Sequence, residues 1–127
     1  MFIRIDLTSD TPIYLQIKNE IIRGIATGEL KVGDQLPTVR RLAEELGINL
    51  HTVNKAYNLL KREGFISLNR KRGAVVVERE NRNKDMERLK QILTPIVNEY
   101  FCKNFTRDDF IKVIDEIYED IEKQSNM

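Results

Sequence analysis

Residues 38–58 read TVRRLAEELGINLHTVNKAYN, so that two short helical patterns lie on either side of a single glycine. Thr38 can cap a helix over residues 39–46, and Asn49 can cap a second helix over residues 50–63. Gly47 suits the turn between them because glycine adopts the left-handed conformation without strain. Apolar side chains recur at helical spacing and form the expected buried stripes: Leu42, Ala43, Leu46, Val53, Ala56, Tyr57 and Leu60.

Two helices joined by a tight glycine turn are the sequence signature of a helix-turn-helix, whose second helix enters the DNA major groove. Asn54 and Asn58 can pair with adenine, and Lys55 can reach guanine or a phosphate. We therefore expect the side chains outside the buried stripe of the second helix to read the DNA sequence: Asn49, Leu50, His51, Asn54, Lys55 and Asn58.

Arg40 and Arg41 lie in the first turn of the helix over residues 39–46, beside the helix N-terminus, where contacts with phosphates form. The alternative is that both arginines only solvate this helix. His51 likewise fits an exposed side chain as well as it fits a base reader, and Tyr57 fits the core better than a stacking platform.

A β-hairpin is expected next, because apolar runs over residues 65–68 and 74–78 flank a turn over residues 69–73. Cations crowd the tip of this turn beside a glycine: Arg70, Lys71, Arg72 and Gly73. Adjacent cations repel each other unless an anion compensates them, and a DNA backbone or minor groove would supply that anion. We therefore expect the hairpin to be a DNA-binding wing, the alternative being a solvated charged turn.

An amphipathic helix precedes this motif, since isoleucines recur at helical spacing over residues 13–25. Thr11 is expected to cap this helix, Pro12 to occupy its first position and Gly28 to end it. Residues 28–34 then read as a turn-rich connector.

After the hairpin, residues 79–84 are polar and read as a linker or a helix start, and two amphipathic helices follow. Pro95 lies inside the first of these helices, where it removes a backbone donor and should bend the helix. Asn104 breaks the helical pattern. Thr106 is expected to cap the last helix, which has two aspartates in its first turn.

The two tail helices have wide apolar faces that one helix pair cannot bury, and a domain of this size is marginal. Packing against the same pair of a second subunit would bury both faces in a two-fold bundle. The residues expected in this dimer interface are Leu93, Val97, Tyr100, Phe101, Phe110, Ile114, Ile117 and Ile121. The alternative is that these helices fold back onto the winged helix.

The chain is therefore expected to hold a winged helix-turn-helix DNA-binding domain over residues 1–79 and a two-helix dimerisation region over residues 80–127. Charge follows this division: 13 basic and 9 acidic residues give +4 in the first part, and 8 basic and 11 acidic residues give −3 in the second. A basic part can bind a polyanion while an acidic part avoids it, although uneven surface charge is the plain alternative.

The composition argues against several function classes. One cysteine and one histidine form neither an intrachain disulfide nor a usual zinc site, so we expect no metal. The chain has no glycine-rich phosphate loop and no paired histidine and cysteine, so we expect neither an enzyme nor a cofactor. No signal-peptide pattern and no membrane-length apolar run occur, which predicts a cytoplasmic protein.

A ligand pocket needs roughly 300 Å³ or more, which two short helices are not expected to enclose within one subunit. The sequence leaves open whether an unknown small effector binds at the dimer interface.

From about residue 11 to residue 77, the chain resembles the GntR family of bacterial regulators. The motifs that carry the resemblance follow in order: Pro12–Ile17, Gly28–Arg40, Leu42-Ala43, Leu46-Gly47, Thr52-Val53, Ala56-Tyr57, Leu60, Glu63–Ile66 and Arg72-Gly73. The short C-terminal part is similar to the YtrA subfamily, whose members carry two helices there instead of a large effector domain.

The resemblance implies a winged-helix homodimer, usually a repressor, that binds a palindromic operator. It implies that Arg40 contacts DNA, that residues 49–54 begin the recognition helix and thus add Thr52 to the site, and that residues 70–73 form the wing tip.

The chain also departs from the family pattern. Thr38 replaces the usual serine and keeps its capping role, while Arg41 stands where an acid is common. Both residues are expected, with Arg40, in the DNA-binding site. Leu50 and Asn54 stand where many members carry an arginine, so the operator sequence of better-known relatives does not carry over.

The sequence as a whole predicts a mainly α fold with a small β-hairpin and a sequence-specific transcription regulator. The competing hypothesis is a winged helix that binds an acidic protein partner through its basic tip. That hypothesis predicts weak DNA binding without sequence preference.

Overall fold

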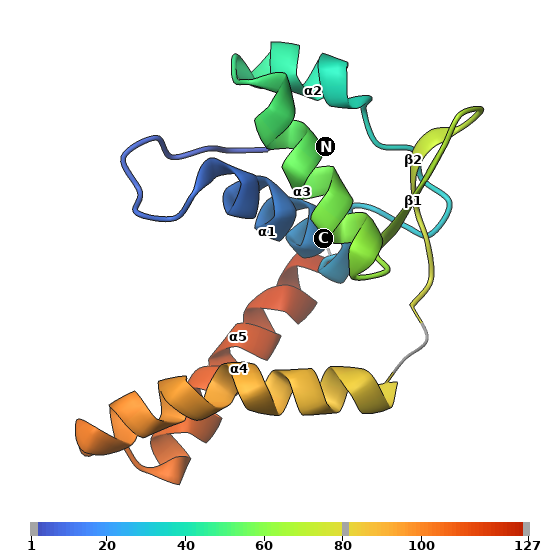
Figure 1. The fold of residues 1–127 in the computed structure, drawn as a ribbon. Helices are drawn as coiled ribbons and strands as arrows, with labels where there is room; N and C mark the ends of the chain where they lie inside the picture. Colours follow the sequence, from blue (N-terminus) through green and yellow to red (C-terminus); the bar gives the residue numbers. More distant parts are fainter. Residues whose placement is uncertain (1–2, 80–81, 126–127) are drawn as a thin grey trace. The chain divides into compact units, whose positions relative to one another are not determined.

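The computed structural model describes residues 3–79 and 82–125. The chain divides into two compact units, Met1–Arg79 and Glu80–Met127 (Figure 1). In the described residues the first unit contains α1 (Ile13–Ala26), α2 (Val39–Leu46), α3 (Leu50–Arg62), β1 (Ile66–Asn69) and β2 (Gly73–Val76). The second contains α4 (Arg82–Cys102) and α5 (Arg107–Ser125). The mainly α fold with one small hairpin is confirmed.

The core of the first unit lies where α3 packs against both α1 and α2. Its most buried side chains, each at most 2 % exposed, come from these three helices and from both strands: Ile17, Ile21, Leu42, Val53, Ala56, Tyr57, Leu60, Ile66 and Val76. Complete burial of one such aliphatic side chain stabilises the fold by roughly 1.5–3 kcal/mol. This packing fixes the rotation of α3 about its own axis.

The predicted helix boundaries around the central turn are confirmed. Thr38 Oγ1 accepts a hydrogen bond from the Arg41 N–H at 3.1 Å, and Gly47 ends α2 in the left-handed conformation at φ 65°. Asn49 Oδ1 accepts from the His51 N–H at 2.8 Å and so caps α3. Because caps depend on neighbouring residues alone, sequence reasoning locates them well.

The prediction that Thr11 caps the first helix is wrong, because Pro12 is the N-cap and its ψ of 145° is extended rather than helical. The carbonyl of Pro12 accepts from the N–H groups of Leu15 and Gln16, both at 3.1 Å. The side chain of Gln16 donates instead to the carbonyl of Thr11, at 2.8 Å. The helix therefore begins at Ile13, without a side-chain cap.

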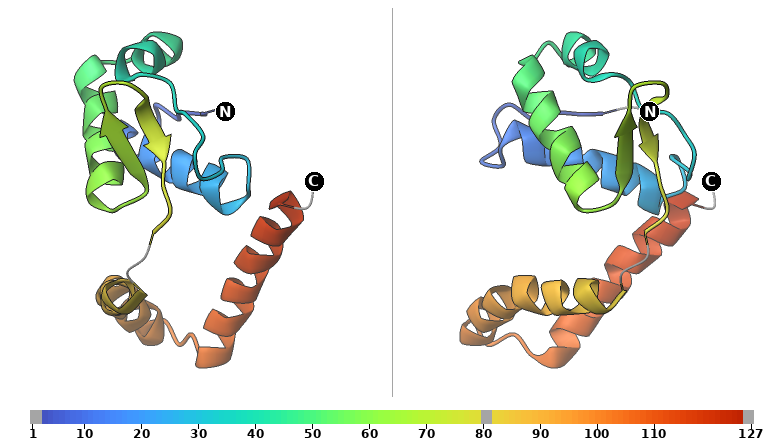
Figure 2. Two further views of the ribbon diagram at one scale, coloured as in Figure 1. Left: turned by 90° about the vertical axis from the view of Figure 1, so that its right-hand side faces the viewer. Right: turned by 45° about the vertical axis from the view of Figure 1, so that its right-hand side comes forward.

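The hairpin is antiparallel, with Ile66 opposite Val76 and Asn69 opposite Gly73. Its strands are displaced by one or two residues from the predicted runs. The connection between α1 and α2, expected to be a turn-rich linker, also pairs with β2, as the left view of Figure 2 shows. Three backbone hydrogen bonds hold it there: Gly33 N–H to Val76 O at 2.8 Å, Val76 N–H to Asp34 O at 2.9 Å and Leu36 N–H to Ala74 O at 2.8 Å.

In the second unit, α4 runs through Pro95 without interruption. The left view of Figure 2 looks along the first part of α4, and the later part leaves that axis, so the helix is bent. A bend is what the missing backbone donor of Pro95 predicts. Asn104 follows α4 in the left-handed conformation at φ 68° and ends the helical pattern as predicted. Of the polar stretch over residues 79–84, residues 80 and 81 lie outside the described residues, and α4 begins at Arg82.

Thr106 caps α5, as predicted, through a reciprocal pair with Asp109. The Asp109 N–H donates to Thr106 Oγ1 at 3.2 Å, and the Thr106 N–H donates to Asp109 Oδ2 at 2.7 Å. The backbone and hydroxyl hydrogen bonds from Thr106 hold the pKa of the Asp109 carboxyl below its ordinary value. None of the described helices combines the length and the apolarity needed to cross a membrane.

Replacing Tyr57 by phenylalanine tests the one polar contact made by a core side chain on α3. The Tyr57 hydroxyl donates to the Pro37 carbonyl at 2.7 Å, and burial raises the pKa of this hydroxyl. We expect Tyr57→Phe to lower the free energy of unfolding by about 1 kcal/mol, since the hydrogen bond is lost. Urea denaturation followed by circular dichroism measures this change.

Tyr118→Phe is the matched control, because the Tyr118 side chain is 61 % exposed and should change stability by less than ~0.5 kcal/mol. Equal stability of both variants would contradict a structural role for the Tyr57 hydroxyl.

Candidate nucleic-acid interface

The predicted base-reading side chains lie along the side of α3 that points away from the core. Burial of Val53, Ala56, Tyr57 and Leu60 assigns the inner face of the helix. Five predicted residues are exposed on the other side, namely Leu50, His51, Asn54, Lys55 and Asn58, and Lys61 and Arg62 are exposed further along the same helix. The structure thus brings these five together on one solvent-facing surface, and their contact with bases stays a prediction.

Two further members of the predicted site lie at the start of α3. Asn49 uses its side-chain oxygen as the helix cap, which leaves its amide donors for another partner. Thr52 is half-buried, one turn before Ala56. Asn49 therefore helps to fix the start of α3.

The two arginines of α2 differ in their surroundings. Arg41 Nε lies 3.0 Å from Glu45 Oε1, one turn further along the helix. These side chains are 72 % and 50 % exposed, so the pair is weak, about 0.3–0.5 kcal/mol, and can open for a phosphate. Arg40 is exposed and forms no salt bridge with any residue that the structure describes. Its full charge is therefore available to an anion.

The wing tip carries its cations in an ordered turn. Arg70, Lys71 and Arg72 are exposed, and Gly73 has a φ of 69°, a conformation that favours glycine. Asn69 Oδ1 accepts from the Arg72 N–H at 2.5 Å and closes the turn. Arg70 and Lys71 make no salt bridge within residues 3–79 and 82–125. The tip thus presents positive charge that the described part of the chain does not neutralise.

Gln35 holds this tip to the connection between α1 and α2. Its Nε2 donates to the carbonyl of Arg72, and its backbone forms a bridge with Val75. Arg72 Nη2 in turn donates to the Gly33 carbonyl at 3.4 Å, so this guanidinium is partly engaged by the protein itself. Sequence reasoning missed Gln35, because a single glutamine in a turn-rich segment carries no local signal.

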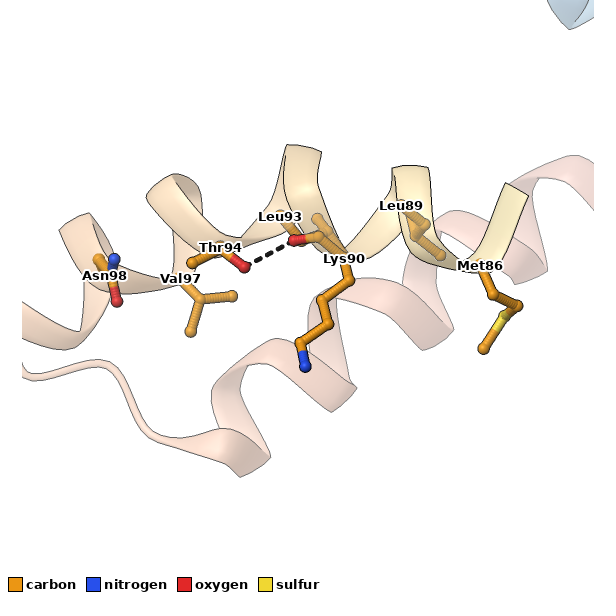
Figure 3. Close-up of a pocket in the computed structure, with 7 residues that line it drawn as sticks. All are labelled: Met86, Leu89, Lys90, Leu93, Thr94, Val97 and Asn98. Atoms are coloured by element: carbon orange, nitrogen blue, oxygen red, sulfur yellow. Dashed lines mark hydrogen bonds between the residues drawn. The ribbon is translucent and has the colours of Figure 1, made fainter. Parts of the chain in front are cut away.

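In the second unit, apolar side chains predicted for a dimer interface are exposed in the single chain. Phe101 is 74 % exposed and Ile117 50 %. Val97 and Ile114 are also exposed, whereas Leu93, Tyr100, Phe110 and Ile121 are half-buried. Figure 3 shows the side chains of Met86, Leu89 and Val97 extending from the same side of α4. The Thr94 hydroxyl, on the same helix, donates a hydrogen bond to the Lys90 carbonyl at 2.6 Å. The exposed apolar side chains of α4 and α5 are therefore not covered by the other helix of the pair.

A groove of about 400 Å³ lies between α4 and α5. It is lined by Leu93, Val97, Phe101, Phe105, Thr106, Arg107, Phe110 and Ile114. The ring of Tyr100 closes the helical hairpin nearby, edge-on to Phe105 and to Phe110 at centroid distances of 5.2 and 6.2 Å. The groove is larger than the roughly 300 Å³ that a ligand pocket needs. Much of its lining is exposed, so the groove is open rather than enclosed.

Residues 13–76 match the family model of the bacterial regulatory proteins, gntR family. The chain belongs to the GntR family, and the predicted resemblance is confirmed. It is 46 % identical over 76 residues to the HTH-type transcriptional repressor YtrA of Bacillus subtilis. That match covers 60 % of this chain and 58 % of YtrA, so the chain spans little more than half of this relative.

Solved structures agree with this assignment. YtrA from Sulfolobus acidocaldarius, a GntR-family transcription factor, is 53 % identical, with a TM-score of 0.60 over 72 % of this chain and 96 % of its own. A transcriptional antiterminator from Listeria monocytogenes is 27 % identical, with a TM-score of 0.84 over 95 % and 92 %. The AraR DNA-binding domain in complex with operator ORX1 is 28 % identical, with a TM-score of 0.52 over 58 % and 92 %.

Replacing Gln35 by alanine tests whether this side chain orders the wing tip. We expect the backbone order parameters of residues 69–73 to fall from about 0.85 toward 0.6, because the tip loses its side-chain tether to the α1–α2 connection. Nitrogen-15 relaxation measures the change. Gln91→Ala, at an exposed position of α4, is the control and should leave the tip unchanged.

Proposed function

We propose that the protein is a homodimeric transcriptional repressor that binds a palindromic operator. The observation that carries this proposal is the exposed face of α3, in a unit where Arg40, Arg70 and Lys71 are exposed and form no salt bridge with any described residue. The same unit thus offers side chains that can hydrogen-bond base edges and cations that can bind phosphates, as sequence-specific DNA binding requires. The name of the B. subtilis relative and the operator complex of the AraR domain support this choice.

In the proposed complex α3 lies in the major groove. Asn54 and Asn58 pair with adenine, Lys55 reaches guanine or a phosphate, and Leu50, which is 40 % exposed, contacts a thymine methyl group. Arg40 binds the phosphate backbone at the N-terminus of α2. Arg70 and Lys71 bind the backbone or minor groove beside the wing.

The second unit supplies the dimer contact in this proposal. Isolated apolar side chains are common on protein surfaces, but contiguous apolar patches mark interaction sites. Such a patch is formed by the exposed Val97, Phe101 and Ile114, which line one groove between α4 and α5. Ile117, one turn after Ile114 on α5, is exposed as well. A second copy related by two-fold symmetry would cover this patch and fill the groove between the helices. The two recognition helices would then meet half-sites about 34–36 Å, or one DNA turn, apart.

In vitro selection from random duplex DNA, at about physiological salt, tests the proposed function. Enrichment of a palindrome is the expected result, and it would establish the dimeric, sequence-specific mode. Absence of any enriched sequence would contradict it. If, in addition, charge reversal of Arg70 and Lys71 left the residual DNA affinity unchanged, a winged helix that binds an acidic protein would be favoured instead.

Arg40→Ala should weaken specific and non-specific DNA binding alike. It should reduce the magnitude of the slope of log affinity against log salt by about two, because the dimer loses one phosphate contact in each of its two subunits. For the unmodified dimer, with roughly 6–10 phosphate contacts, affinity should fall about 10³–10⁵-fold between 50 and 200 mM salt. Fluorescence anisotropy across a salt series measures both effects. Arg88→Ala, at an exposed position of α4, is the control. Affinity unchanged by Arg40→Ala would remove Arg40 from the interface.

Ile114→Asp should convert the dimer into monomers, because a carboxylate in a buried apolar contact is strongly unfavourable. Light scattering at micromolar concentration should give twice 14.9 kDa for the natural chain and 14.9 kDa for the variant. Glu116→Ala, at an exposed charged position of α5, should leave the dimer intact. A monomeric natural chain would contradict the proposed assembly.

A further inference from the structure

We propose that Tyr14 is a positioning residue for DNA recognition, because its ring holds the Lys55 ammonium group beside the DNA-facing side of α3 before DNA is bound. The inference rests on the proposed function, since it concerns the same recognition helix. It adds a residue of α1 to the recognition machinery, although no side chain of α1 was expected there from the sequence.

The geometry brings the two side chains together across the α1–α3 contact. Tyr14 lies in the first turn of α1, is half-buried and packs against the core, so its ring has a fixed place. Lys55 is exposed on α3, one turn after His51 and one turn before Asn58. Its Nζ lies 3.9 Å from the centroid of the Tyr14 ring, well inside the distance at which a cation is attracted to a π face.

The charge of Lys55 is held but not neutralised. Lys18 pairs with Glu63 at 2.8 Å and Arg41 with Glu45 at 3.0 Å, whereas Lys55 forms no salt bridge with any described residue. The face of the Tyr14 ring contacts only one side of the Lys55 ammonium group, and the N–H donors on its other side stay free to form hydrogen bonds. The held lysine therefore keeps its charge and donors for a base or a phosphate.

Holding the lysine in advance favours binding for an entropic reason. A free lysine populates many rotamers and loses this freedom when it docks. If the ring limits those rotamers in the free protein and stays in contact in the complex, less entropy is lost when DNA binds. The attraction comes from the face of the ring and not from the hydroxyl, so phenylalanine should serve in place of tyrosine while leucine should not.

A double-mutant cycle on the operator obtained by selection, with a scrambled duplex as reference, tests the inference. Tyr14→Leu should weaken operator binding about two- to tenfold per half-site, and Tyr14→Phe, the matched control, less than twofold. In a Lys55→Ala background, Tyr14→Leu should have no further effect, because the group that the ring positions is gone. A general loss of folding would not follow this pattern, and thermal melting of each variant checks for it.

Three results of the cycle would overturn the inference. Equal losses from Tyr14→Phe and Tyr14→Leu would assign the effect to the hydroxyl. An undiminished loss in the Lys55→Ala background would mean that Tyr14 acts without Lys55. Stronger binding by Tyr14→Leu would mean that the ring withholds the lysine from DNA.

A second measurement needs no substitution. Ring-current shifts of the Lys55 side-chain protons should be present in the natural protein, both free and bound to operator, and their absence from the bound state would overturn the inference. If the natural protein binds the operator no better than the scrambled duplex, the proposed function fails as well. If it binds the operator specifically and the cycle shows no coupling, the positioning role alone fails.

Discussion

The packing of α3 against α1 is the constraint on which the DNA-facing surface depends. Ile17 and Ile21 on α1 and Val53 and Leu60 on α3 are completely buried where these helices meet. Removing this apolar surface from water fixes the rotation of α3, because any other rotation would expose the stripe. The polar side chains on the opposite side are thereby turned outward as a set.

The ends of α3 are fixed by different means. Asn49 caps its N-terminus, and Tyr57, near its middle, anchors the segment before α2 by donating to the Pro37 carbonyl. At the other end, Lys18 reaches from α1 to Glu63 at 2.8 Å. Helix, turn and preceding segment therefore form one packed body, which suits a surface that has to match the width of a DNA groove.

The wing depends on a segment that is distant from it in sequence. A two-stranded hairpin alone is at best marginally stable in water, and this one gains a third, strand-like neighbour in residues 33–36. Gln35 extends the contact to the tip by bonding the Arg72 carbonyl. A tip with three adjacent cations resists its own electrostatic repulsion better when its backbone is tied in this way.

Local features were predictable from the sequence because they depend on residues a few positions apart. The caps at Thr38, Asn49 and Thr106 and the left-handed turn at Gly47 are of this kind. The cap expected at Thr11 failed because Pro12 adopts an extended ψ and takes that position itself. Which side of α3 faces solvent also followed from helical periodicity, since every turn repeats the same pattern of burial.

Tertiary structure alone decided the contacts between segments far apart along the chain. The pairing of residues 33–36 with β2, the bond from Gln35 to Arg72 and the Tyr14–Lys55 contact join residues about 40 positions apart. No local pattern marks such partners, because they meet only after the hydrophobic core has brought their elements together. Composition and periodicity thus determined which helices form and which faces they bury, while the packing of those faces determined how the wing is held and which side chain lies beside Lys55.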